Sequence, residues 1–254
     1  MKNFGIDVSK WQGDFKFDAA INEGVSFAIL KGGGNDNGLY VDSKFEENYA
    51  KAKNLKLPVG VYWFSKAVSE QEAVKEADFF FTKILSGKQF ELPVYIDVEH
   101  QNMLSLGKDK LTSVVQKWCS YLENKGFWVG IYSSVYSFSK HMNDAELKKY
   151  THWVAQWAKE CTYKETDVLD MWQFGGETNL LKSPFVAGVV CDQNYMYKDF
   201  PSLIINAKLN GFDDTFVSPN QPTLNKKSVD TSRFFSFCVP EMVFSPQFFR
   251  QNVC

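Results

Sequence analysis

Residues 93–100 read PVYIDVEH, an apolar run that ends in two acids one residue apart. A run of this composition predicts a strand buried in the core of a protein. Side chains alternate along a strand, so Asp97 and Glu99 share one face, with Cα atoms about 6.5–7 Å apart at a rise of about 3.3 Å per residue. Two acids this close repel one another as they ionise, and we expect one to keep its proton while the other is charged. The pair therefore suits acid–base chemistry.

Similar apolar runs recur through the first two thirds of the chain, with helical patterns between them. The predicted strands are 4–8, 26–31, 59–64, 93–98, 129–133, 153–157, 169–174 and 187–193. The predicted helices are 43–54, 70–85, 108–125 and 145–150, with shorter ones after Asp14 and near 201–208. Strands that alternate with helices favour a parallel sheet, and eight of them favour a closed β/α barrel.

The barrel is expected to be irregular in its last third. The stretches after the sixth and seventh strands contain Gly and Pro but little helical period, so helices should be missing or reduced there. The prediction is an irregular TIM-like β/α barrel with eight strands. A doubly wound open sheet is the alternative fold, but no GxGxxG motif follows the first strand to support dinucleotide binding.

Two regions are predicted along the chain. Residues 1–211 form the barrel, and residues 212–254 form a linker and an atypical C-terminal tail. The linker is polar and contains proline, whereas the final stretch is crowded with phenylalanine and has no clear period.

Composition excludes several classes of function. The 254 residues are 44% hydrophobic and carry 28 basic against 30 acidic residues, which describes a soluble globular protein without a nucleic acid or an anionic membrane as partner. Five scattered cysteines and three histidines without HxxxH spacing predict no disulfide framework, no metal site and no cofactor. The N-terminus shows no signal peptide or membrane span, so synthesis in the cytoplasm is expected.

Acids also end two other predicted strands. Asp7 closes the first strand and Asp192 closes the eighth, and these strands are neighbours once a barrel closes. Active sites of β/α barrels lie at the C-terminal ends of the strands, so these two acids should face the same cleft as Asp97 and Glu99. A helix cap or a surface ion pair is the alternative for any one acid, but four acids at three strand ends favour a site.

Aromatic side chains and amides gather at the same predicted rim. They are Trp11, Tyr62, Trp63, Phe64, Tyr132, Trp157, Trp172 and Tyr195, with Gln12 and Gln173. Flat apolar rings beside carboxyl and amide groups are typical of a sugar-binding groove, although half of these aromatics are expected to be core. The predicted substrate-binding residues are Trp11, Tyr62, Phe64, Tyr132, Trp157 and Gln173. The glycine run at 32–34 lacks a P-loop ending and is predicted to be a flexible rim loop.

Eight segments together resemble glycoside hydrolase family 25, the Chalaropsis-type lysozymes or N-acetylmuramidases. They are GIDVSKWQG, FAILKGG, GVYWF, PVYIDVE, GIYSS, WVAQW, MWQF and CDQNY, in this order over about residues 3–211. The resemblance implies a flattened barrel that hydrolyses the β-1,4 bond from N-acetylmuramic acid to N-acetylglucosamine. The partner it implies is the glycan strand of bacterial peptidoglycan.

The resemblance also implies roles for individual residues. Glu99 matches the general acid and Asp97 its partner, while Asp7 and Asp192 match the acids that flank them. Tyr62 matches a tyrosine of the third-strand motif, which here is followed by tryptophan in place of the more usual histidine. Glycines follow the second strand where relatives often carry Thr-Glu, and this places the substrate contacts at that edge in question.

Several alternatives stay open at this point. The partner acid either stabilises an oxazolinium formed by the substrate's own acetamide, which we favour, or attacks directly as a nucleophile. A catalytically silent glycan-binding barrel is the alternative function, and a chitinase-like hydrolase is disfavoured by the short DVE motif. The protein is expected to be a monomeric endolysin or autolysin that reaches the wall after holin-type or lytic release. The tail contains NKKSVDT, which resembles the start of a wall-binding repeat and suggests a remnant of one.

Overall fold

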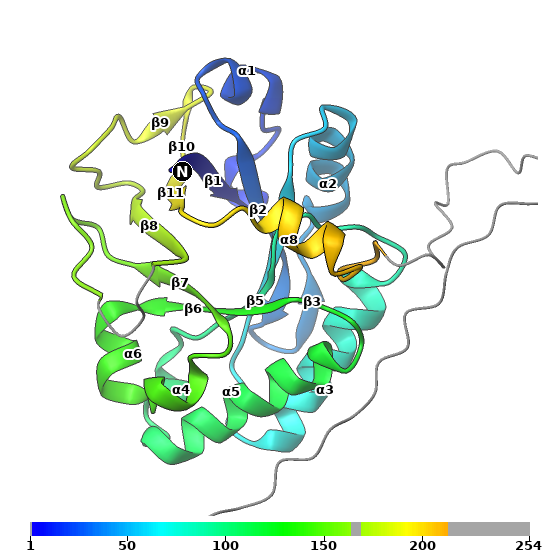
Figure 1. The fold of residues 1–254 in the computed structure, drawn as a ribbon, viewed down its shortest axis with the longest axis vertical. Helices are drawn as coiled ribbons and strands as arrows, with labels where there is room; N and C mark the ends of the chain where they lie inside the picture. The colour runs from blue at the N-terminus through cyan, green and yellow to red at the C-terminus, as the bar shows by residue number, and fades with distance from the viewer. Residues whose placement is uncertain (1, 164–168, 213–254) are drawn as a thin grey trace, which may run out of the picture. The chain divides into compact units, whose positions relative to one another are not determined.

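Eight strands close into a barrel in the computed structural model, which describes residues 2–163 and 169–212 (Figure 1). Neighbouring strands around the barrel pair in the order β1, β2, β4, β5, β6, β7, β8 and β11, and β11 returns to β1. The strands are β1 (Asn3–Val8), β2 (Phe27–Asn35), β4 (Val59–Phe64), β5 (Val94–Asp97), β6 (Val129–Ser134), β7 (Thr151–Ala155), β8 (Met171–Gly175) and β11 (Asp192–Met196). The predicted barrel is confirmed.

The last strand departs from the prediction. β11 runs antiparallel to both of its neighbours, and it begins at Asp192, so the predicted strand at 187–193 was wrong in direction and bounds. A short hairpin of β9 (Phe185–Val186) and β10 (Val189–Val190) precedes it. A parallel strand needs a long crossover, usually a helix, to carry the chain back along the barrel. No helix lies between β8 and β11, so the chain re-enters the barrel from the mouth.

The glycine run after the second strand is also more ordered than predicted. β2 extends through all three glycines and pairs with β3 (Leu39–Val41) as a hairpin, where a flexible loop was expected. Gly32 forms a bulge in the pairing of β2 with β4, and a Cβ atom there would lie 2.8 Å from the Phe80 ring. The glycines therefore allow close packing of the strand.

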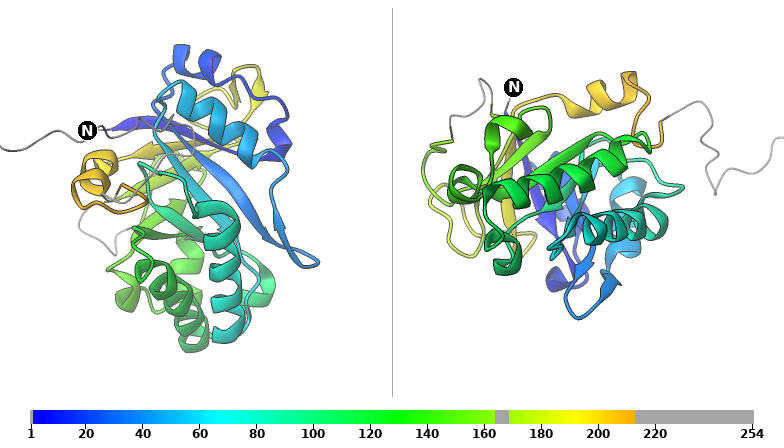
Figure 2. Two further views of the ribbon diagram at one scale, coloured as in Figure 1. Left: turned by 90° about the vertical axis from the view of Figure 1, so that its right-hand side faces the viewer. Right: turned by 90° about the horizontal axis from the view of Figure 1, so that it is seen from below.

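The longer helices cover one side of the barrel (Figures 1 and 2). They are α2 (Phe45–Asn54), α3 (Glu70–Phe80) with its wide final turn η2 (Phe81–Leu85), and α5 (Lys108–Glu123). The shorter ones are η1 (Lys10–Gln12), α1 (Phe17–Asn22), α4 (Gln101–Leu104), α6 (Val135–His141), α7 (Asp144–Leu147) and α8 (Phe200–Asn206). In the described part of the chain no helix follows β7 or β8, as predicted. None of the described helices has the length and apolar character needed to span a bilayer.

Aromatic rings cover the outer wall where helices are missing. Phe174 on β8 stacks on Tyr195 of β11 with ring centroids 4.3 Å apart, and Trp172 packs edge-on against Phe174. The ammonium of Lys2 lies 3.5 Å from the centroid of the Tyr195 ring. Trp172 and Tyr195, which were among the predicted rim aromatics, therefore lie on the outside of the barrel.

Two hydrophobic clusters stabilise the fold. The inner one fills the barrel and includes Phe27, Ile29, Tyr95 and Trp153, whereas the outer one lies between the barrel and the helices. Strand alternation separates the two, since each barrel strand turns successive side chains inward and outward. The predicted tail at 213–254 lies outside the described residues.

A buried carboxylate joins the helices to the rim of the barrel. Glu76 on α3 is 1% exposed and accepts hydrogen bonds from Trp63 Nε1 (2.9 Å), Ser65 Oγ (2.6 Å), Asn35 Nδ2 (2.9 Å) and the backbone N–H of Lys66 (3.3 Å). Four hydrogen-bond donors compensate this carboxylate for its removal from water. Glu76 therefore holds the upper ends of β2 and β4 in place. Trp63 points away from the mouth because it alternates with Tyr62 along β4, and Glu76 accepts the hydrogen bond of its buried indole.

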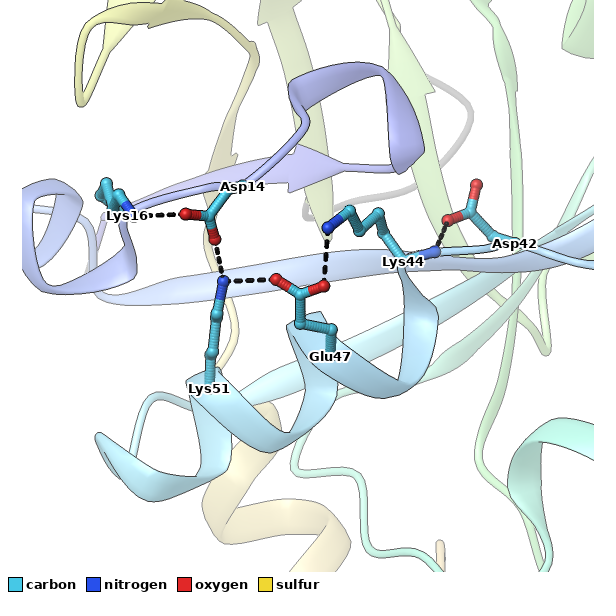
Figure 3. Close-up of polar contacts among 6 residues, drawn as sticks. All are labelled: Asp14, Lys16, Asp42, Lys44, Glu47 and Lys51. Atoms are coloured by element: carbon cyan, nitrogen blue, oxygen red, sulfur yellow. Dashed lines mark hydrogen bonds and ion pairs between the residues drawn. The ribbon is translucent and has the colours of Figure 1, made fainter.

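Charged residues attach α2 to the loop that follows β1. Figure 3 shows Lys51 between two carboxylates, Asp14 and Glu47, with its ammonium 2.6 Å from Glu47. At the start of the helix, the backbone N–H of Lys44 donates to Asp42 at 3.0 Å. Exposed ion pairs contribute only about 0–1 kcal/mol each, so these contacts orient the helix more than they stabilise it.

The role of Glu76 can be tested with Glu76→Gln. The new amide turns an N–H₂ group toward donors that have no other acceptor, so the free energy of unfolding should fall by about 2–3 kcal/mol in urea denaturation. Glu46→Gln is the matched control, because Glu46 is an exposed partner of Lys88 and should change stability by less than about 0.5 kcal/mol. Equal stability of Glu76→Gln and the wild type would contradict this account.

Candidate active site

Four carboxyl groups meet at the mouth of the barrel. Asp97 is the last residue of β5, Glu99 follows two residues later, and Asp7 on β1 pairs in register with Asp192 on β11. All four line one cleft of about 180 Å³. The other residues that line it are Tyr62, Tyr132, Trp153, Trp157 and Gln173. The structure thus brings together the four acids that were predicted to share a cleft.

Asp192 reaches the mouth by a different route from the predicted one. It begins an antiparallel strand, whereas the prediction placed it at the end of a parallel one. Both positions lie at the same rim, because β11 runs downward from the mouth. Gly176 follows β8 beside it, and a Cβ atom at this position would collide with Asp192 Oδ1 and with the Trp157 ring.

Two amides hold Asp7 as a hydrogen-bond acceptor. Its Oδ2 atom accepts from Gln173 Nε2 (3.1 Å) and from Asn194 Nδ2 (2.8 Å). The indole N–H of Trp157 donates to Gln173 Oε1 (3.2 Å), and that of Trp153 donates to Asn194 Oδ1 (2.8 Å). Because an indole N–H only donates, each amide must turn its N–H₂ group toward Asp7. Two tryptophans therefore determine how Asp7 is held.

Burial shifts the titration of the two cross-strand acids. Burial raises the pKa of Asp192 to about 8, and the nearby charges of Asp7 and Glu99 add to the rise. Burial also raises the pKa of Asp7 to about 6, while its hydrogen bonds from Asn194 and Gln173 lower it. The difference arises because Asp7 has two amide donors, which favour its charged form.

The two acids of the DVE motif differ in exposure. Asp97 is 4% exposed, and its Oδ1 atom has no hydrogen-bond partner among the described residues. Burial raises the pKa of Asp97 well above its ordinary value, and the charge of Glu99 adds to this effect. Glu99 lies at the open side of the cleft, where partial desolvation raises the pKa of its carboxyl and Lys31 opposes the rise. In the free cleft, burial therefore favours a proton on Asp97 at least as strongly as on Glu99.

The predicted substrate-binding residues fall into two groups. Tyr62, Tyr132, Trp157 and Gln173 line the cleft, and the Tyr132 hydroxyl donates to Gln173 Oε1 at 2.9 Å. Trp11 and Phe64 do not line it. Trp11 is 79% exposed on η1 next to the rim. Phe64 ends β4 beneath the ammonium of Lys31, which lies 4.9 Å from the centroid of its ring.

Several residues of the site were not predicted. Trp153 and Asn194 face inward on β7 and β11 and complete the network around Asp7. Their signal in the sequence is strand alternation, since Asn194 lies two residues after Asp192. Lys31 was predicted only as the last residue of the second strand, 26–31. Among residues 2–163 and 169–212, no group of three or more histidine, cysteine or acidic side chains is arranged to hold a metal ion.

Comparison with known proteins places the chain in a family. Residues 6–182 match the sequence profile of the glycosyl hydrolases family 25. The chain belongs to glycosyl hydrolase family 25. This match covers more than half of the chain, including all of the strands from β2 to β8 and the acids Asp7, Asp97 and Glu99.

Known proteins are similar to this chain in sequence or in fold. An autolytic lysozyme of Clostridium acetobutylicum is 32% identical over 155 residues, which cover 60% of this chain and 44% of that protein. The chain thus spans less than half the length of this curated relative. The CTP1L endolysin aligns with a TM-score of 0.68 at 21% identity, over 80% of this chain and 70% of that one. A lysozyme of Streptomyces coelicolor aligns with a TM-score of 0.66 at 23% identity, over 83% and 98%. These structures share the fold.

The raised pKa of Asp192 predicts a pH-dependent gain in stability for Asp192→Asn. The folded state keeps a proton up to a pKa of about 8, whereas the unfolded state loses it near 3.8, so stability falls as pH rises between these values. Asparagine does not ionise, so the stability of the variant lacks this fall with rising pH. The Tm of the variant at pH 7 should exceed that of the wild type by at least about 3 °C, roughly 1 kcal/mol, and the gain should shrink toward pH 4.

Asp199→Asn is the matched control for this substitution. Asp199 caps α8, where its hydrogen bonds with Ser202 lower its pKa, so the control should give no gain at pH 7. An equal gain for Asp192→Asn at pH 4 and pH 7 would contradict the assigned cause.

Proposed function

We propose that the protein is a muramidase that hydrolyses the β-1,4 bond from N-acetylmuramic acid to N-acetylglucosamine in bacterial peptidoglycan. The observation that carries the proposal is the cleft itself, in which four carboxyl groups from three strands meet beside aromatic rings. Family membership and a lysozyme relative support the same substrate class. The protein would act on the cell wall, as an endolysin or an autolysin, and its expected partner is the glycan strand.

Glu99 is the proposed general acid. It would donate its proton to the leaving oxygen as the bond to C1 lengthens. Its position at the open side of the cleft supports this role, because a bound sugar would cover the carboxyl and raise its pKa further. The proton is then retained until the bond breaks.

Asp97 is proposed to stabilise positive charge once substrate is bound. In the free cleft burial disfavours the ionised form of Asp97. The substrate would therefore supply the hydrogen-bond donor and the positive charge that favour this form. An acetamide N–H of the sugar would satisfy the unpartnered Oδ1 atom, and an oxazolinium would pair with the carboxylate. This dependence on the acetamide favours substrate assistance over direct attack.

Asp7 and Asp192 are proposed to shape the site. Asp7 is held as an acceptor by Gln173 and Asn194, which leaves its remaining oxygen for the substrate or for water. Asp192 lies opposite it and tends to keep its proton near neutral pH, so it is able to donate a hydrogen bond. The pair thus offers one acceptor and one donor to the same bound group.

The glycan must extend beyond the cleft. Its volume of about 180 Å³ is below the range of about 300–1,000 Å³ that is typical of ligand pockets, so it suits a single sugar ring. Neighbouring sugars would lie over the rim, where Trp157 and Trp11 expose flat apolar surfaces. A monomer is sufficient for this arrangement, because one chain supplies all the residues named.

The reaction can be tested by digesting purified peptidoglycan and reducing the products. Reduced muramic acid at the new ends is expected, since cleavage after muramic acid frees its C1. Reduced glucosamine would indicate a glucosaminidase instead. Glu99→Gln should release about 10²–10⁴-fold less product, because a positioned general acid contributes a factor of this size.

No release by the wild type, together with pull-down by insoluble peptidoglycan, would replace the proposal with the catalytically silent barrel. Glu146→Gln, an exposed change of the same kind, controls for loss of charge. Its activity should equal that of the wild type.

The charged role of Asp97 predicts a severe loss in Asp97→Asn. Asparagine keeps the shape and the hydrogen-bond acceptor but never carries the negative charge that would face the oxazolinium. We expect kcat to fall by at least about 100-fold, with a smaller change in KM, because the lost interaction forms only in the transition state. A loss below about tenfold would show that a neutral group suffices at this position.

A further inference from the structure

Lys31 brings a positive charge to the acidic mouth. Phe27 and Ile29 on β2 face the inside of the barrel, whereas Leu30 belongs to the outer cluster. Lys31 continues the inward series and pairs in register with Tyr62, which lines the cleft. The bulge at Gly32 then ends the alternation. Lys31 is therefore the last inward-facing residue of β2 before the bulge, at the end of the strand nearest the mouth.

The ammonium of Lys31 is held by rings, and no described carboxylate lies within ion-pair distance. Its Nζ atom lies 4.9 Å from the centroid of the Phe64 ring and 5.6 Å from that of Tyr62. The neighbouring Lys66 also approaches Phe64, but it forms an ion pair with Asp36 at 3.0 Å. In the described part of the chain, the ammonium of Lys31 forms no hydrogen bond and no ion pair. Its charge therefore remains available to the cleft.

We propose that Lys31 is a positioning residue whose ammonium supplies the fixed positive charge that allows the carboxyl groups of the cleft to ionise. The inference rests on the proposed function, because it concerns the charge state that the reaction needs. Four acids in one partly buried cleft cannot all ionise without an opposing charge. Rings hold the ammonium at the rim, so it acts through space and leaves the oxygens of the acids free for substrate.

The direction of the effect is the same for three acids. Lys31 lowers the pKa of Asp7, Asp97 and Glu99 against the effect of their burial. Other titratable groups also face Asp97 from the surrounding strands and hairpin. They are Asp7, Glu99, Tyr40, Tyr62 and Tyr132. None of these carries a positive charge, so Lys31 is the cation that opposes the repulsion at Asp97.

The test compares pH profiles of kcat/KM for Lys31→Met and Lys31→Arg on soluble peptidoglycan fragments. Loss of the ammonium raises the pKa of Asp97, so the acidic limb moves to higher pH. It also raises the pKa of Glu99, so the alkaline limb moves in the same direction. We expect the profile of Lys31→Met to move upward by about 1 unit or more, a shift typical of a nearby opposite charge. Lys31→Arg should stay close to the wild type, and so should Lys66→Met, which removes the paired cation.

A profile of Lys31→Met that overlays that of the wild type, or moves downward, would overturn the proposal. A second readout does not need activity. Carbon-13 NMR titration of labelled aspartate in the free protein should show a higher pKa for Asp97 in folded Lys31→Met than in the wild type. An unchanged titration would count against the role of Lys31 even if the variant were inactive. Failure of the wild type to release muramic acid ends would instead reject the proposed function and leave this titration as an independent test.

Discussion

The pairing of Asp7 with Asp192 is the constraint on which the rest of the site depends. These residues lie far apart in the sequence, yet they oppose each other where β1 and β11 close the barrel. Side chains directly opposite in an antiparallel pair point to the same face, and like charges there repel. Burial is the main reason that the pKa of Asp192 rises to about 8, and the repulsion from Asp7 that closure of the barrel creates adds to this rise. The fold cannot close in this register without an acidic cleft that resists full ionisation.

Two kinds of group relieve this repulsion: the neutral amide donors around Asp7 and the ammonium of Lys31. Amides from Gln173 and Asn194 hold Asp7, and indole N–H groups fix the direction of both amides. Asp97 has no such donor on its Oδ1 atom. An oxygen left unpaired in this way is unfavourable in the free protein, and a substrate that supplies an N–H recovers the lost interaction. The site thus gives up stability at the atom where the proposed substrate would bind.

Much of the fold could be predicted from local patterns. The strand at 59–64 was predicted with its observed bounds, and alternation placed Asp97 and Glu99 on the face of the cleft. The direction of β11 was predicted wrongly although the helix before it was expected to be missing, because the strand's own residues do not signal its direction. Tyr62 and Trp63 are adjacent aromatics at the same predicted rim, yet one faces the cleft and the other donates to Glu76. Strand alternation accounts for the opposite directions of the two side chains, but the buried acceptor of the Trp63 indole on α3 could not be predicted from a local pattern.

The glycine run shows how backbone alone can shape a binding site. Gly32 absorbs the bulge, Gly33 passes against the backbone of Tyr40, and a Cβ atom on Gly34 would lie 2.8 Å from that of Phe64. A side chain at the last position would displace the Phe64 ring, on which the ammonium of Lys31 rests. The glycines therefore allow the Phe64 ring to keep its place beneath the cation. Through the Phe64 ring, the glycines help to position the ammonium that we propose balances the charge of this cleft.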